Sequence, residues 1–166
     1  MRETVDALIN QTFPTKRIFV VLAMEEREKE AKEKAKLLIS EFKKVFGSII
    51  VTYHPDIEGE VKGKSSNQSY AAKFMYTNFV KKKIIDIKYS TVTTADADSI
   101  FDPQYFSYLA YEFLRDEKRY HKFWQSATVY YNNFWKVPPP TRIISFFGSL
   151  WRTGVLIQKD KKILRK

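Results

Sequence analysis

The fold is decided by residues 17–54, RIFVVLAMEEREKEAKEKAKLLISEFKKVFGSIIVTYH. Residues 17–23 and 48–54 are short runs rich in β-branched and apolar side chains, which predict two buried strands. Between them, apolar residues recur at steps of three and four, which predicts a helix that ends at Gly47. Two strands joined through a helix predict a parallel crossover, and therefore an α/β fold.

The middle of the chain predicts another helix and a third strand. Ser65 is followed three positions later by Gln68, a pattern typical of a capping box, and the apolar residues behind it predict a helix over about 66–81. The segment 84–95 is dense in Ile, Val and Thr, which predicts a strand that ends just before Asp96.

The remainder of the chain predicts a helix, a strand and a final helix. Asp102 and Pro103 are a favourable cap and first-turn pair, and apolar spacing predicts a helix up to Arg115. Residues 121–131 are expected to form an aromatic-rich strand, and residues 143–156 an amphipathic helix.

The length, composition and net charge of the chain limit the class of protein it can be. The 166 residues, 44% of them hydrophobic, are expected to form a single domain. The absence of cysteine excludes disulfides, thiolate zinc sites and cysteine nucleophiles, and no apolar run approaches the roughly 20 residues that cross a bilayer. A net charge of +10 indicates attraction to an anionic partner, such as a nucleotide, a nucleic acid or an acidic bilayer.

Asp96 and Asp98 are the first candidate site. Side chains alternate along extended backbone, so two acids one residue apart can point to the same side and share a cation. A divalent ion such as Mg²⁺ prefers carboxylate and phosphate oxygens and often takes only one or two protein carboxylates. The alternative is a solvated turn in which Asp98 or Asp102 caps the next helix.

Lys64 is the second candidate. Gly63, Lys64 and Ser65 before a helix suggest a phosphate-binding loop, but that motif requires glycine at position 58, where this chain has glutamate. Lys64 near a helix N-terminus could still contact an anion without that loop geometry. The alternative is an exposed loop lysine.

Three segments together carry a family resemblance: HPDIEGEVKGKSSNQSYA (54–71), TVTTADADSIFDPQYFSYLAYEFL (91–114) and FWQSATVYYNNFWKVPPPTRIISF (123–146). In this order they resemble the family 2 glycosyltransferases, close to the large membrane-linked members, over about residues 5–157. The resemblance implies a partial A-type glycosyltransferase (Rossmann-like) domain with a mainly parallel central sheet flanked by helices. It also implies a nucleotide-sugar donor, expected to be a UDP-sugar, and a divalent cation, Mg²⁺ or Mn²⁺.

By matching positions, the resemblance implies a donor site made of four residues. Asp98 would bind the metal that bridges the donor diphosphate, and Asp96 would lie beside the ribose and phosphates and share the metal. Lys64, with Asn67 behind it, would line the donor pocket, where a cation offsets phosphate charge.

The resemblance also implies an acceptor side. Gln125 and the pair Asn132 and Asn133 match the segment beside the acceptor cleft, although a structural role for these amides is an equal alternative. The family's first strand and the acidic pair that supplies its general base have no counterpart in this sequence. We therefore expect a fragment with metal-dependent nucleotide binding and little or no transfer, and the catalytic base cannot be named.

Two further hypotheses use the charge differently. Three Trp, ten Tyr and thirteen Phe beside excess Lys and Arg could form a nucleic-acid-binding module without catalysis, by stacking and phosphate contacts. The helix at 143–156, with Arg142 and Arg152, could lie on a membrane surface instead of in a core. A cytoplasmic location, either free or at the cytoplasmic face of a membrane, is the expectation that accompanies the glycosyltransferase hypothesis.

Overall fold

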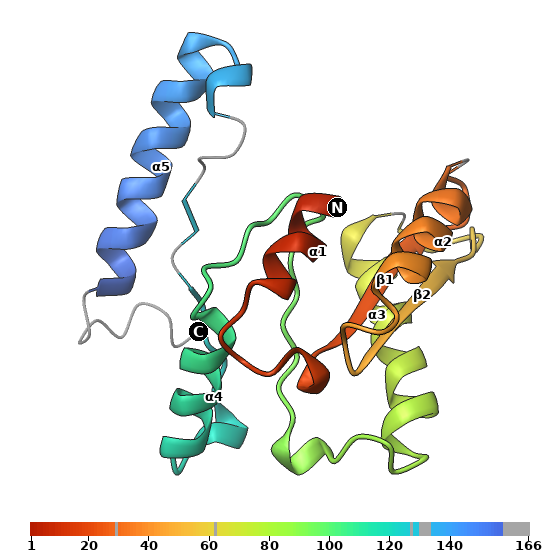
Figure 1. The fold of residues 1–166 in the computed structure, drawn as a ribbon. Coiled ribbons are helices and arrows are strands. Elements are labelled where there is room, and N and C mark those ends of the chain that lie inside the picture. The colour runs from red at the N-terminus through yellow and green to blue at the C-terminus, as the bar shows by residue number, and fades with distance from the viewer. Residues whose placement is uncertain (29, 62, 127, 130–133, 158–166) are drawn as a thin grey trace. The chain divides into compact units, whose positions relative to one another are not determined.

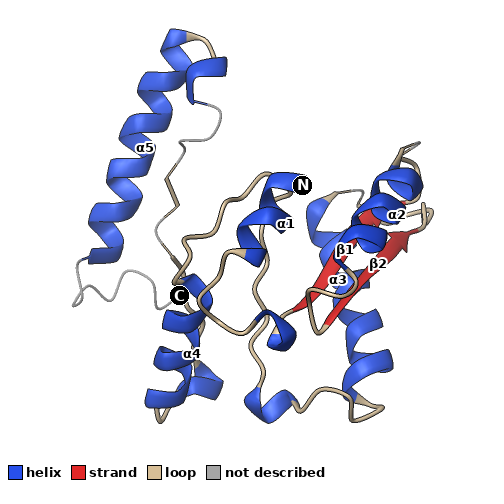
Figure 2. Ribbon diagram, in the orientation of Figure 1, coloured by secondary structure: helices blue, strands red, loops and turns tan. Residues whose placement is uncertain are grey.

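The computed structural model describes residues 1–28, 30–61, 63–126, 128–129 and 134–157. It divides into an N-terminal unit, Met1–Ser107, and a C-terminal unit, Tyr108–Lys166, which we describe separately (Figure 1). The described part is a mixed α/β structure whose sheet has two strands (Figure 2).

A parallel pair of strands forms the centre of the N-terminal unit. Strand β1 (Phe19–Glu25) pairs with β2 (Ser48–His54), and the register runs from Phe19 opposite Ser48 to Glu25 opposite His54. Helix α2 (Ala31–Phe42) connects them. The predicted strand–helix–strand crossover is therefore confirmed, with β1 displaced two residues toward the C-terminus.

The core of the N-terminal unit lies between the strands, α1 (Arg2–Ile9) and α2. Helix α2 buries residues 31, 35, 38 and 42, the spacing that places side chains on one face of a helix. Its neighbour Leu37 points away and is 67% exposed. The core consists of Val5, Leu8, Ile18, Val20, Leu22, Met24, Ala31, Ala35, Leu38, Phe42, Phe46 and Ile49.

Helix α3 (Lys64–Met75) also packs on both strands and continues as a π-helical turn, η2 (Tyr76–Val80). The predicted helix is confirmed, but its capping box is wrong. The helix begins after Gly63, whose φ of 155° suits a residue without Cβ, and no side chain caps it. Because it starts this early, Ser65 lies inside the first turn, and the hydroxyl of Ser66 donates to the Gly63 carbonyl at 2.8 Å.

The strand predicted over residues 84–95 is absent from the structure. Residues 87–89 form a short 3₁₀ turn, η3 (Ile87–Tyr89), and residues 90–95 follow it without regular structure. Asp86 accepts a hydrogen bond from the Lys88 amide at 2.9 Å, a local bond that competes with strand pairing. Val92 is 89% exposed, so its β-branched side chain has no buried neighbours that would stabilise a strand here.

The C-terminal unit is built from helices. Helix α4 (Tyr105–Arg115), which begins just before the unit boundary, confirms the predicted helix and its end at Arg115, but it starts two residues after Pro103, the predicted first-turn residue. Short 3₁₀ turns follow at η4 (Arg119–His121) and η5 (Phe134–Lys136), and α5 (Pro139–Ile157) confirms the final helix with an earlier start. Proline is tolerated in a first helical turn because its missing N–H has no partner there.

The strand predicted over residues 121–131 is not formed in its described part, residues 121–126 and 128–129. After α4 the chain turns sharply: the Lys118 amide donates to Asp116 Oδ1 at 2.8 Å, and Lys122 forms an ion pair with the same carboxylate. These two bonds, that of Lys122 first, lower the pKa of Asp116. Of the described aromatic residues here, Trp124 packs on α4, edge-on to buried Phe113 with ring centroids 5.9 Å apart, whereas Phe123 is 76% exposed.

Two adjacent leucines of α2 test this core. Leu38→Ala is expected to lower the free energy of unfolding by about 2–5 kcal/mol, because it leaves a cavity at a side chain that is 6% exposed. The same substitution at Leu37 is the control and should stay within about 0.5 kcal/mol of wild type. Urea unfolding followed by circular dichroism measures both, and equal losses would contradict the orientation of α2.

Candidate functional site

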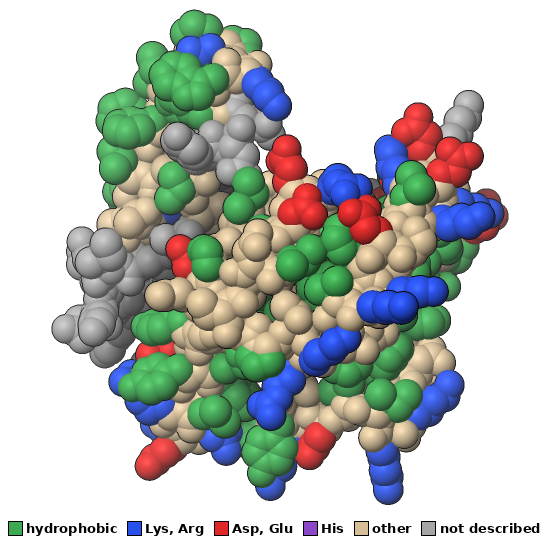
Figure 3. Space-filling view, viewed as in Figure 1, with side chains coloured by type: hydrophobic (Ala, Val, Ile, Leu, Met, Phe, Trp, Pro, Cys, Tyr) green, Lys and Arg blue, Asp and Glu red, His purple; other side chains and the backbone are tan. Residues whose placement is uncertain are grey.

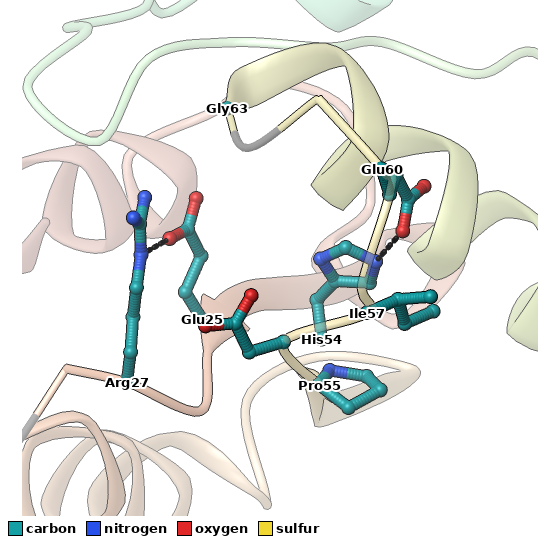
Figure 4. Close-up of a pocket in the computed structure, with 8 residues that line it drawn as sticks. Glu25, Arg27, His54, Pro55, Ile57, Glu60 and Gly63 are labelled. Atoms are coloured by element: carbon teal, nitrogen blue, oxygen red, sulfur yellow. Dashed lines mark hydrogen bonds and ion pairs between the residues drawn. The ribbon is translucent and has the colours of Figure 1, made fainter.

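The carboxyl ends of β1 and β2 meet at one edge of the sheet, where open α/β folds commonly bind ligands. The amide of Glu26 donates to the His54 carbonyl at 2.9 Å and closes the end of the pair. A small pocket lies here, lined by Glu25, Arg27, His54, Pro55, Asp56, Ile57, Glu60 and Gly63 (Figure 4).

Four groups of this pocket, Glu25, Arg27, His54 and Glu60, form two pairs. Glu25 forms an ion pair with Arg27, and its hydrogen bond raises the pKa of that guanidinium. His54, 8% exposed, places Nε2 3.1 Å from Glu60 Oε2 (Figure 4). The hollow has a volume of about 20 Å³, room for on the order of one water molecule. In this conformation the pocket is too small for a nucleotide.

Asn67 fixes α3 to the sheet beside this pocket. Its Nδ2 donates to the carbonyl oxygen of Ala23 in β1 at 2.9 Å. Its Oδ1 is buried and has no hydrogen-bond partner among the described residues. The amide that the resemblance assigns to donor binding therefore has a structural contact on one side, and it positions the first turn of α3.

Lys64 and Asp96 lie together although 32 positions separate them in sequence. Lys64 is the first residue of α3, and its ammonium group forms an ion pair with Asp96 Oδ1. Both side chains are well exposed, at 59% and 64%. An exposed pair of this kind contributes at most about 1 kcal/mol to stability, so the contact is easily exchanged for another.

The segment from Asp96 to Ser99 is a turn that α1 holds in place. The Ser99 amide donates to the Asp96 carbonyl at 3.1 Å, and Thr4 Oγ1 of α1 donates to the Ala97 carbonyl at 2.8 Å. The side chain of Asp98 is exposed on this turn. The turn thus presents both carboxylates to solvent, but it follows an irregular segment and not the end of a third strand.

The chemistry of the turn fits a hard cation. Asp96 and Asp98 supply carboxylate oxygens, the ligands that Mg²⁺ and Mn²⁺ prefer. Among the described residues there is no cluster of three or more His, Cys, Asp or Glu that could hold a metal ion. A cation at this turn would therefore need further oxygens from a ligand or water.

The structure leaves the acceptor-side assignment of Gln125, Asn132 and Asn133 untested. Gln125 belongs to the C-terminal unit and is exposed. Asn132 and Asn133 lie outside the described residues. Their assignment to an acceptor cleft stays a prediction.

The pocket at the strand ends was not predicted from the sequence. Glu25 and His54 are the last residues of two strands in a parallel pair, and such ends lie at the same edge of a sheet. Exact strand limits would have revealed this juxtaposition. The expected strand at 17–23 stopped two residues short of Glu25.

One isosteric substitution tests the role of Asn67. Asn67→Asp replaces the Nδ2 donor by an oxygen that faces the Ala23 carbonyl, so the free energy of unfolding is expected to fall by about 2 kcal/mol or more. Asn78→Asp is the matched control in η2: it also removes an Nδ2 donor, to the Phe74 carbonyl at 3.1 Å, but this bond is exposed to water and Lys82 donates to the side-chain oxygen, so the loss should be much smaller. Similar thermal unfolding of the two variants would refute the contact with β1.

Comparison with models of protein families, with curated proteins and with solved structures finds no significant match for this chain.

Proposed function

We propose that the N-terminal unit binds the diphosphate of a nucleotide-sugar donor, expected to be a UDP-sugar, through a divalent cation at Asp96 and Asp98. In an intact glycosyltransferase such a site serves transfer of a glycosyl group to an acceptor. One observation carries the proposal: Lys64 and Asp96 come together beside the first turn of α3, at the carboxyl-end side of the sheet. The family 2 glycosyltransferase resemblance supplies the identity of the ligand.

The three charged side chains have complementary tasks in this proposal. Asp96 and Asp98 offer oxygens to the cation, while Lys64 and the amide groups at the start of α3 favour the phosphates. The ion pair of Lys64 with Asp96 is exposed and weak, so Asp96 can exchange its lysine partner for the cation. A divalent cation bound here would offset the charge that develops on a leaving diphosphate.

The same geometry argues for weak binding. Asp96 is 64% exposed, and water and salt screen exposed charges strongly. No carboxylate of the described residues is assigned as the general base for an acceptor hydroxyl. We therefore propose weak, metal-dependent donor binding with little or no transfer for this chain, in the cytoplasm or at the cytoplasmic face of a membrane.

Calorimetric titration with a uridine diphosphate sugar and Mn²⁺ tests the site. The native chain should release heat only when metal is present, and Asp98→Ala should weaken binding at least tenfold, about 1.4 kcal/mol. Glu33→Ala is the control, because it removes one exposed acid from α2 and leaves the turn intact.

Two outcomes would refute the proposal. One is no heat with the native chain, and the other is equal heat after Asp98→Ala. Salt-dependent retention on single-stranded nucleic acid that persists in Asp98→Ala would instead favour the nucleic-acid alternative. That alternative draws support from Tyr76, 51% exposed, with the ammonium group of Lys81 5.6 Å from its ring centroid.

A further inference from the structure

Helix α5 presents its apolar side to solvent. Its polar residues Arg142, Ser145, Ser149 and Thr153 recur at steps of three and four and form one strip along the helix. Hydrophobic side chains gather on the outside of this helix (Figure 3). The exposed apolar residues, 52% to 75% exposed, are Ile143, Ile144, Phe146, Phe147, Leu150 and Trp151. Ser149, in the polar strip, is only 7% exposed.

The polar strip forms hydrogen bonds within α5 and with the segment just before it. Ser149 donates to the Ser145 carbonyl at 2.8 Å, and Thr153 donates to the Ser149 carbonyl at 2.9 Å. Arg142 Nε donates to the Val137 carbonyl at 2.8 Å. An amphipathic helix in water normally turns its polar face outward. This reversed orientation leaves a contiguous apolar surface that marks an interaction site.

The positive charge on and after α5 indicates which kind of partner binds this surface. Helix α5 carries two arginines and no acidic residue. The nine residues that follow it in the sequence carry five Lys or Arg and one Asp. Two copies of this chain joined through α5 would bring these like charges together, whereas an anionic lipid surface would attract them.

The composition of the apolar face agrees with a lipid interface. Phe146, Phe147 and Trp151 are large aromatic side chains, which suit the boundary between headgroups and acyl chains. No helix of the described residues is long and apolar enough to span a bilayer. The arrangement therefore fits a helix that lies in the plane of the surface.

We propose that α5 binds the surface of an anionic membrane, with the apolar face of Ile143, Phe147 and Trp151 immersed at the headgroup boundary and the polar strip turned toward the protein. This binding uses the C-terminal unit alone. It does not depend on the nucleotide-sugar proposal.

Flotation of the full chain with lipid vesicles tests the inference. The chain should float with vesicles of phosphatidylglycerol and phosphatidylcholine in equal parts and much less with phosphatidylcholine alone. The double variant Phe147→Ser, Trp151→Ser should lose roughly tenfold or more in partitioning, because two exposed aromatics no longer enter the interface. The control is Val61→Ser, Val92→Ser, which removes two exposed apolar side chains of the N-terminal unit and should float like wild type.

Three results would overturn the inference. They are equal flotation of the double variant and wild type, equal flotation with neutral and anionic vesicles, and a dimer by light scattering that the double variant abolishes without any flotation of wild type. If circular dichroism shows that the double variant does not fold, the tryptophan fluorescence of the wild-type protein tests the inference instead. Quenching by brominated phosphatidylglycerol is expected, and no quenching would contradict membrane contact.

Discussion

The parallel pairing of β1 with β2 is the constraint on which the N-terminal unit depends. In-register pairing brings the ends Glu25 and His54 to one edge and requires a crossover, which α2 supplies. The same pair provides the surface on which α3 packs and the Ala23 carbonyl that holds Asn67. The position of Lys64 beside the acidic turn follows from that contact, because Lys64 lies one helical turn before Asn67.

The sequence predicted the parts of the fold whose signals are local and reinforced by burial. Residues 17–54 combine two apolar runs with a helical period. In the structure, the two strands and the helix that these patterns predict pack together in one core. The segment 84–95 has strand composition but no such partner, and a local hydrogen bond to Asp86 prevails. Residues with high strand propensity form a strand only where they are paired and buried, and the sequence of a single segment shows neither.

The candidate site was only partly within reach of the sequence. The resemblance grouped Lys64 with Asp96, and the structure brings these two together, but it also gives Asn67 a contact with the backbone of β1. The sequence does not distinguish an amide side chain that holds the fold together from one that binds a ligand. The His54–Glu60 pair in the pocket was not foreseen, because it depends on where two strands end and on the path of the loop between them.

The two-stranded sheet has a further consequence for handling the protein. Within the described residues β1 and β2 are each other's sole strand partners, so each keeps one flank of backbone N–H and C=O groups without a strand neighbour. Helices α2 and α3 pack on the strands, but helix packing does not provide backbone hydrogen bonds to the N–H and C=O groups of a strand flank. Such flanks recruit extended segments from other molecules. We therefore expect any self-association of this protein at high concentration to involve these two strand flanks.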